Sequence, residues 1–158
     1  MNSFRFKKLA LNLSIIFFLF FVDRISKIYI LNIAENIGTV DIYINNFLNL
    51  ILVWNTGVGF GILSFEEKIA YNLITGIIII VNLIIIILII KSEDFKIYFY
   101  LIILGGSLGN LFDRIYYSAV PDFIDFHIND FHWFIFNVAD VFISLGVICL
   151  IIAEIFFN

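Results

Sequence analysis

Residues 136–157 read FNVADVFISLGVICLIIAEIFF, and this stretch decides the class of fold. A helix needs about 20 consecutive, mainly apolar residues to cross the hydrocarbon core of a bilayer, and the stretch has that length. However, the carboxylate of Asp140 lies one turn inside its start, and Asn137 lies three residues earlier. An ionisable group in a spanning helix costs roughly 2.5–3.5 kcal/mol on insertion scales, so Asp140 is a candidate functional residue.

Three further apolar stretches lie at about residues 9–31, 69–90 and 97–115. Of the 158 residues in the chain, 63% are apolar, and the mean hydropathy is +1.09. A water-soluble protein could not bury so much apolar surface. The sequence therefore predicts an all-α polytopic membrane protein, a single domain over residues 1–158, with four transmembrane helices that include 136–157.

The basic residues predict the orientation of these helices. Five of the nine lie before the first helix or between the second and the third: Arg5, Lys7, Lys8, Lys91 and Lys96. The segments 32–67 and 116–135 contain neither Lys nor Arg. Cytoplasmic loops are rich in these residues, so we expect both segments outside and both termini in the cytoplasm. The net charge of −4 says little about partners, and no nucleic-acid partner is expected.

The two outer segments are predicted to be the irregular parts of the chain. The first has β-branched and aromatic residues around an Asn-Asn turn signal, which favours a hairpin or small sheet over 39–55 on the membrane surface. Gly57, Gly59 and Gly61 follow, and they suit either a close approach of backbone to a bound peptide or a flexible turn. The second segment carries Trp133 in an aromatic run typical of a membrane interface, and a short outer helix or loop is also expected.

Polar residues gather at one end of the predicted helices. Near the outer end of three helices lie Asp23, Arg24 and Lys27; Asn110, Asp113 and Arg114; and Asn137 and Asp140. The i, i+3, i+4 spacing puts each of the last two groups on one helical face. Gly105 and Gly109 form a small-xxx-small pair that allows another helix to approach closely.

The aspartates outnumber the basic residues beside them. Only three basic residues lie near the outer surface. Five aspartates lie there, namely Asp23, Asp113, Asp122, Asp125 and Asp140. Structural ion pairs such as Asp113 with Arg114, or Asp23 with Lys27, account for some of them. At least two carboxylates remain, and two carboxylates that share one proton are the machinery of an aspartic protease.

Other uses of these residues are less well supported. His127 and His132 lie near Asp122 and Asp125, but the D-x-x-D-x-H spacing matches no strong metal motif, and we expect neither a metal nor a cofactor. A proton or ion transporter would carry ionisable groups through the full thickness of the membrane. The segments 69–90 and 97–108 have none.

The segments VDRISK, WNTGVGFG, GGSLGNLFDR, VPDFIDF and FNVAD occur in this order over residues 22–146. This set resembles lipoprotein signal peptidase, also called signal peptidase II. The resemblance implies an aspartyl endopeptidase of the bacterial inner membrane, working near the periplasmic face. Its expected substrate is a prolipoprotein whose cysteine carries a diacylglyceryl group, cut just before that cysteine. Membrane lipids are its other expected partners, and a monomer suffices.

The same resemblance assigns the candidate site residues. The catalytic pair falls on Asp122 and Asp140. Supporting polar positions fall on Asp23, Asn55, Asn110, Arg114 and Asn137. Without the resemblance, Asp113 would rank beside Asp122. The family often has Gln at the position of Arg24, and it also implies a surface sheet and a periplasmic helix that cradle the substrate.

Overall fold

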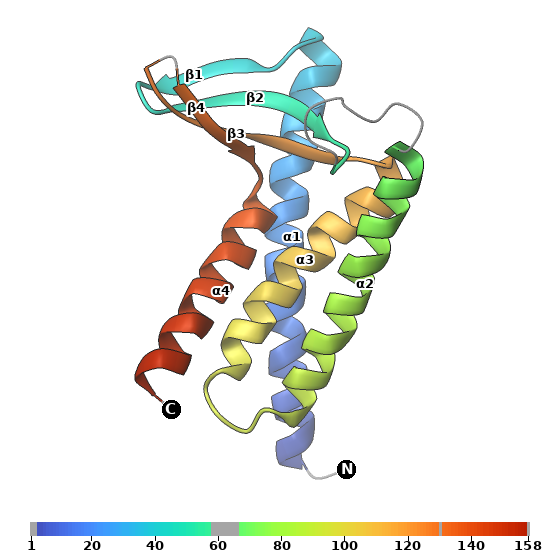
Figure 1. Ribbon diagram of the computed structural model, residues 1–158, viewed down its shortest axis with the longest axis vertical. Coiled ribbons are helices and arrows are strands. Elements are labelled where there is room, and N and C mark those ends of the chain that lie inside the picture. Colours follow the sequence, from blue (N-terminus) through green and yellow to red (C-terminus); the bar gives the residue numbers. More distant parts are fainter. Residues whose placement is uncertain (1–2, 58–66, 130, 158) are drawn as a thin grey trace.

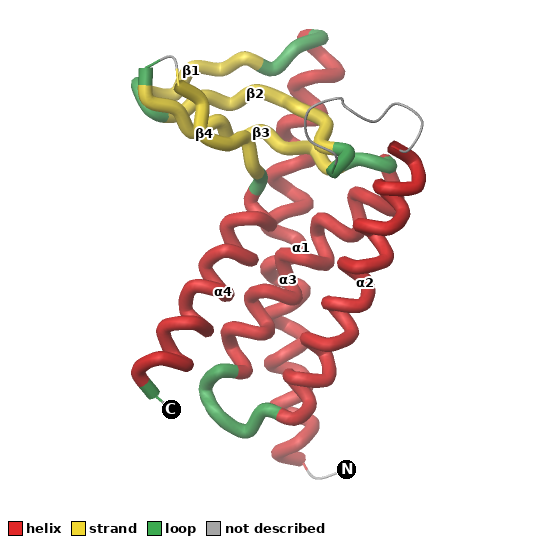
Figure 2. Tube along the Cα trace, in the orientation of Figure 1, coloured by secondary structure: helices red, strands yellow, loops and turns green. Residues whose placement is uncertain are grey.

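Four helices form an elongated bundle, and four strands form a sheet across one end of it (Figures 1 and 2). The computed structural model describes residues 3–57, 67–129 and 131–157, apart from the side chains of Phe4, Glu67 and Lys68. The elements follow in the order α1 Ser3–Ile37, β1 Asp41–Asn45, β2 Leu48–Asn55, α2 Glu67–Lys91, α3 Ile97–Tyr117, β3 Val120–Ile128, β4 Phe131–Phe136 and α4 Val138–Phe156.

Each stretch predicted to be a spanning helix is helical. Three of the helices in the described chain are long and apolar enough to cross a membrane, namely α1, α2 and α4. Most of their large apolar side chains are exposed, as expected for surfaces that face lipid. Both ends of the chain and the connection between α2 and α3 lie at the end of the bundle opposite the sheet (Figure 1).

Helix α3 is the centre of the bundle, because it packs against α1, α2 and α4. Small residues permit this. A Cβ added at Gly105 would lie 2.8 Å from Cβ of Leu19 on α1, so the close approach predicted from the small-xxx-small pair is confirmed. On the opposite side, a Cβ at Gly106 would lie 2.6 Å from the backbone oxygen of Ala139 on α4.

The sheet is an antiparallel meander with the strand order β1-β2-β3-β4. It packs on the end of α1 through a cluster of Ile30, Val40 and Phe123. The hairpin predicted over 39–55 is confirmed as β1 and β2. No short helix occurs in the described outer residues 38–57, 118–129 and 131–136. Residues 58–66, with Gly59 and Gly61, lie outside the described residues, so the predicted outer helix or loop stays a prediction there.

The prediction that 116–135 is irregular is wrong, since most of it forms β3 and β4. Strand β2 has a free edge after pairing with β1, and β3 occupies it, with Asn55 opposite Val120 and Leu48 opposite Phe126. Strand β4 then folds back on β3 through a turn at Asn129, whose φ is 52°. Thus the polar residues of VPDFIDF lie on a strand at the top of the bundle.

Gly106→Ala should destabilise the protein by about 1–3 kcal/mol, because the added methyl group collides with the backbone of α4. The matched control is Gly76→Ala in α2, where nothing lies within 4 Å of the added Cβ. We expect this control to be neutral or stabilising, since alanine favours helix. Thermal unfolding of both variants in detergent measures the difference, and equal losses would contradict the close contact between α3 and α4.

Candidate active site

Asn137 links the side chains of Asp122 and Asp140. It lies between β4 and α4 and is the N-cap of α4. Its Nδ2 donates to Oδ1 of Asp122 on β3 over 2.6 Å. Its backbone N–H donates to Oδ2 of Asp140 over 3.0 Å, and its Oδ1 accepts from the N–H of Asp140 at 3.2 Å. One buried asparagine therefore contacts both carboxylates.

The position of Asp140 in an apolar helix follows from this geometry. Asn137 and Asp140 cap each other reciprocally, as N-cap and N3 of α4. Such a capping box satisfies N–H groups that the first turn of a helix leaves free. The positive end of the helix dipole also stabilises a negative charge there. A carboxylate at this position costs less than one in the middle of the span.

Two further asparagines hold the carboxylates. Asn55 on β2 donates from Nδ2 to Oδ2 of Asp122 over 2.9 Å, while its Oδ1 accepts from the N–H of Gly57 at 2.7 Å. Asn110 on α3 donates from Nδ2 to Oδ1 of Asp140 over 2.8 Å. Together with Asn137, these donors supply one hydrogen bond to each of the four carboxylate oxygens.

Lys27 connects this pair to a buried ionic cluster. Its Nζ lies 2.9 Å from Oδ2 of Asp23, 2.8 Å from Oδ1 of Asn110 and 2.7 Å from Oδ2 of Asp113. The side chains of Lys27, Asp23 and Asp113 are fully buried. Arg24 adds an ion pair with Asp113 at 2.6 Å. Two cations and two anions therefore balance within the cluster.

Asp23 also joins α1 to α4. Its Oδ1 accepts a hydrogen bond from the backbone N–H of Ala139 over 3.0 Å. A Cβ at Gly109 would collide with the same carboxylate, so glycine is required for α3 to lie against it. Arg24 and Lys27 contact Oδ2 of Asp23, which leaves its Oδ1 to accept from the first turn of α4.

The structure separates the five outer aspartates into two kinds. Asp23 pairs with Lys27 as predicted, whereas Asp113 pairs with Lys27 and Arg24 and not with Arg114 as suggested. Asp125 contacts His132 at 2.8 Å. Within the described ranges, Asp122 and Asp140 form no ion pair with a basic side chain. These two are the surplus carboxylates that the count of charges predicted.

Arg114 lies apart from the carboxylates. Its guanidinium stacks over the ring of Tyr71 at 5.4 Å, and the Tyr71 hydroxyl donates to the Arg114 backbone oxygen over 2.7 Å. Gly57, with φ of +81°, passes so close that a Cβ there would lie 2.9 Å from Nη1. Arg114 therefore supports the turn after Asn55, and it reaches Asp122 only indirectly.

Burial raises the pKa of the Asp122 carboxyl above its ordinary value. The hydrogen bonds from Asn137 and Asn55 lower that pKa, and the negative charge of Asp140 raises it. The net direction is upward, so Asp122 keeps its proton to a higher pH than an exposed aspartate. A pair with one proton avoids two adjacent negative charges.

A groove of about 460 Å³ opens beside Asp140, along the face of α4 that carries Val141, Ser144 and Ile148. Phe134 and Phe136 from β4, with Leu145 and Ile148 from α4, supply much of its apolar lining. Asp122 is only 3% exposed, whereas Asp140 is partly exposed and lines the groove. An extended apolar ligand in this groove would therefore meet one carboxylate.

A model of the family described as signal peptidase (SPase) II matches residues 15–156. The chain belongs to the signal peptidase II family. A lipoprotein signal peptidase of Pelagibacter ubique (strain HTCC1062) is 51% identical over 158 residues, which are 100% of this chain and 95% of that one. Another from Anaplasma marginale (strain Florida) is 37% identical, covering 88% of this chain and 81% of that one.

Two solved structures of bacterial membrane enzymes have a similar fold. A bacterial membrane enzyme determined by the in meso method at 1.9 Å resolution superposes with a TM-score of 0.75 and 29% identity, over 94% of this chain and 95% of that one. A second, at 2.3 Å resolution, gives a TM-score of 0.73 and 28% identity, over 92% and 88%. As a signal peptidase II, the protein is a bacterial membrane aspartic endopeptidase that cleaves signal peptides from prolipoproteins.

Sequence reasoning did not find every contact in this signal peptidase. It placed Lys27 among the buried polar groups but did not connect it to Asn110, which depends on how α1 and α3 are rotated against each other. The contact of Asp125 with His132 was not predicted either. A signal was present, because His127 and His132 lie on either side of the dipeptide Asn-Asp, which favours a turn and therefore a hairpin.

Lys27→Met should destabilise the peptidase by about 3–5 kcal/mol, because it leaves the buried carboxylates of Asp23 and Asp113 with Arg24 alone. The matched control is Lys96→Met, which removes an ion pair with the half-exposed Glu154 and should change stability little. Thermal unfolding and the yield of folded protein distinguish the two. If both variants melt together with the wild type, the cluster does not support the fold.

Proposed function

We propose that Asp122 and Asp140 are the catalytic pair of this signal peptidase II and share one proton. The observation that carries the proposal is the shared contact with Asn137, combined with the lack of a cationic partner for either carboxylate in the described part of the chain. The proposed substrate is a prolipoprotein whose cysteine carries a diacylglyceryl group, and the bond cut is the one just before that cysteine.

In the proposed mechanism the two carboxylates have different roles. Asp140 is partly exposed and lines the groove, where water and substrate can reach it, so it takes a proton from the attacking water. Asp122 is buried with a raised pKa, which favours its protonated form, so it donates a hydrogen bond to the scissile carbonyl. The oxygen of that water bonds to the carbonyl carbon, and Asp140 then passes the proton it took to the leaving amine as the C–N bond breaks. Asp122 keeps its own proton at the end, so the pair returns to its starting state.

The remaining candidate residues position this pair. Asn55, Asn110 and Asn137 each orient a carboxylate through one amide N–H. Asp23 fixes the start of α4 through Ala139. Arg114 supports the turn at Gly57 and so acts through Asn55.

The apolar lining of the groove beside Asp140 suits an apolar substrate that lies in the membrane. Its lining residues come mainly from α4 and β4 and are mostly apolar, and α4 itself is long enough to span the membrane. A signal peptide helix and acyl chains lie in lipid, while the scissile bond lies near the interface. The carboxylate pair lies where α4 meets the sheet, which suits that depth.

We further propose four transmembrane helices, α3 included, with both termini in the cytoplasm and the sheet on the periplasmic side of the inner membrane. Lys91 and Lys96 flank the connection between α2 and α3, at the same end of the bundle as the chain termini (Figure 1). Positive charge at that end favours a cytoplasmic location. The proposed enzyme acts as a monomer, because α1, α3, α4, β2 and β3 of one chain supply the whole pair and its support.

Asp122→Asn and Asp140→Asn should each lower turnover by roughly a thousandfold or more, and the double variant should be no worse than either, because the pair acts as a unit. Each substitution keeps one of two accepted hydrogen bonds, so it should cost only about 1 kcal/mol of stability and preserve precursor binding. A gel-shift assay with diacylglyceryl-modified and unmodified precursor measures cleavage per folded molecule.

Asp113→Asn is the control in that assay. It weakens the contacts with Lys27 and Arg24, so it should reduce stability yet keep turnover per folded molecule within roughly tenfold of the wild type. Substantial cleavage by Asp140→Asn, or a loss in Asp113→Asn as complete as in the pair, would refute the assignment.

Reporter fusions test the proposed orientation. Fusions after Gly38, beyond α1, and after Tyr117, at the end of α3, should be active outside the cytoplasm. A fusion after Glu93, between α2 and α3, should be active inside it, because Lys91 and Lys96 retain that loop in the cytoplasm. The reverse pattern would put the carboxylate pair on the wrong side for an exported substrate.

A further inference from the structure

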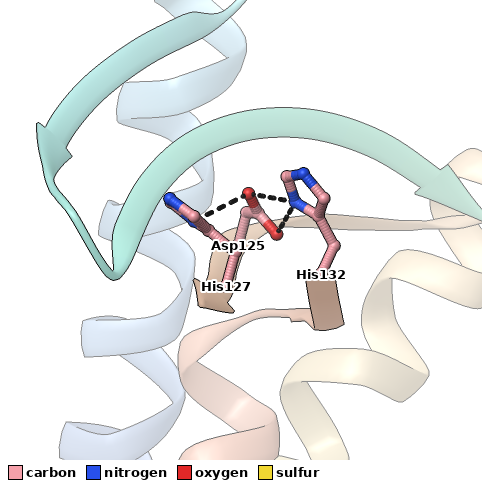
Figure 3. Close-up of side chains that lie close together, drawn as sticks. All are labelled: Asp125, His127 and His132. Carbon is pink, nitrogen blue, oxygen red and sulfur yellow. Dashed lines mark hydrogen bonds and ion pairs between the residues drawn. The ribbon is translucent and has the colours of Figure 1, made fainter. Parts of the chain in front are cut away.

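The hairpin of β3 and β4 brings three possible metal ligands together on one face, namely Asp125, His127 and His132 (Figure 3). Alternation along β3 puts Asp125 and His127 on the same face, and the antiparallel register puts His132 of β4 opposite His127. Their donor atoms all lie within 4.8 Å of one another. Nδ1 of His132 lies 2.8 Å from Oδ2 of Asp125, and Nδ1 of His127 lies 3.4 Å from the same oxygen.

Burial makes this cluster more than a surface ion pair. The Asp125 side chain is fully buried, and His127 is only 8% exposed. Nδ1 of His127 is buried and lacks a hydrogen bond, because its contact with Asp125 does not meet hydrogen-bond geometry. Asn49, which lies opposite Asp125 in β2, also has a buried Oδ1 without a partner among the described groups. Thus the residue opposite Asp125 in β2 and the residue two positions along β3 each have a buried polar atom without a hydrogen bond.

We propose that Asp125, His127 and His132 bind a divalent first-row transition metal ion, with zinc as the reference ion. Two imidazoles and one carboxylate are a common ligand set for zinc, which also accepts an outside ligand such as water. Zinc–ligand bonds of about 2.0–2.1 Å put neighbouring donor atoms roughly 3.3 Å apart in a tetrahedral site. The separation of 3.4 Å between Nδ1 of His127 and the carboxylate oxygen is close to that value. The separation of 2.8 Å for His132 is a hydrogen bond, and it would lengthen by roughly 0.5 Å when an ion enters.

The exposure of the three side chains suits entry of an ion. The His132 side chain is 52% exposed, so it can rotate to bring its nitrogen into place, while Asp125 and His127 form the buried wall. A bound ion would give the unpartnered Nδ1 of His127 the electron-pair acceptor that it lacks. It would also place a positive charge against a carboxylate that is removed from water.

A metal ion at this site would stabilise the two strands that hold the candidate active site, and it would take no part in the chemistry. It joins β3, three residues beyond Asp122, to β4, which runs directly into Asn137. An ion bound there would hold the two strands together where they present their residues to the carboxylate pair. The inference does not depend on the proposed function, since metal binding is measured without substrate.

The test uses the full-length protein in detergent, purified without a histidine tag and treated with a chelator. Zinc binding is followed by titration calorimetry and metal analysis, and cobalt is used as a spectroscopic probe of nitrogen and oxygen ligands. We expect one zinc ion per chain, a higher melting temperature with zinc, and at least tenfold weaker binding in His132→Ala and His127→Phe. Phenylalanine at 127 preserves the ring volume of the buried side chain.

Two variants serve as controls. Asp41→Asn removes an exposed carboxylate from β1 of the same sheet, and Cys149→Ala removes the single thiol; both should bind zinc like the wild type. The chain has no histidine other than these two, so a signal that survives in both histidine variants comes from elsewhere and overturns the proposal. Failure of the wild type to bind zinc does the same and leaves an Asp–His ion pair. Turnover of a modified precursor should survive chelation, which would separate this site from the carboxylate pair.

Discussion

The buried ammonium of Lys27 is the interaction on which the arrangement of the helices depends. An ammonium group has three N–H donors, and here all three have partners, on Asp23, Asn110 and Asp113. These partners come from α1 itself and from α3, so the charge fixes how the two helices are rotated against each other. Because Asp23 also accepts from the start of α4, the same ammonium indirectly sets the position of the third helix. Buried charges are tolerable here because the cluster is neutral as a whole.

The contact with Lys27 also fixes the orientation of the Asn110 side-chain amide in the candidate site. Lys27 can only donate, so Asn110 must present its oxygen to it, and the Nδ2 of Asn110 must then point at Asp140. Asn55 and Asn137 follow the same rule, since the oxygen of each accepts a backbone N–H and its nitrogen is left for Asp122. Each asparagine thus passes a constraint from the scaffold to a carboxylate, and the site gains rigidity without any added charge.

The contacts that the sequence predicted well are of two kinds. They join residues close together in the chain, or residues that lie at the same end of the predicted helices. The Asn137–Asp140 pair follows from i, i+3 spacing, and the contact of Asp140 with Asn110 follows from polar residues at the same end of two helices. The strands over 120–136 escaped prediction because β3 buries the polar Asp125 and His127 and exposes the apolar Phe126 and Ile128, the reverse of the usual alternation. Pairing with β2 decided their structure. Side-chain partners such as Lys27 with Asn110, or Asp125 with His132, depend on helix rotation and strand register, which one chain's periodicity does not specify.

Asn137 has a consequence for how the protein is made. It caps α4 with the same side chain that binds Asp122, so the start of the last helix and the contact with Asp122 depend on one residue. A nascent chain that has emerged only through α3 contains Asp23, Asn55 and Asn110 but neither carboxylate of the pair. With Asp122 and Asp140 as the proposed catalytic pair, proteolytic chemistry requires the last segment of the chain, and it becomes available only when α4 packs against α1 and α3.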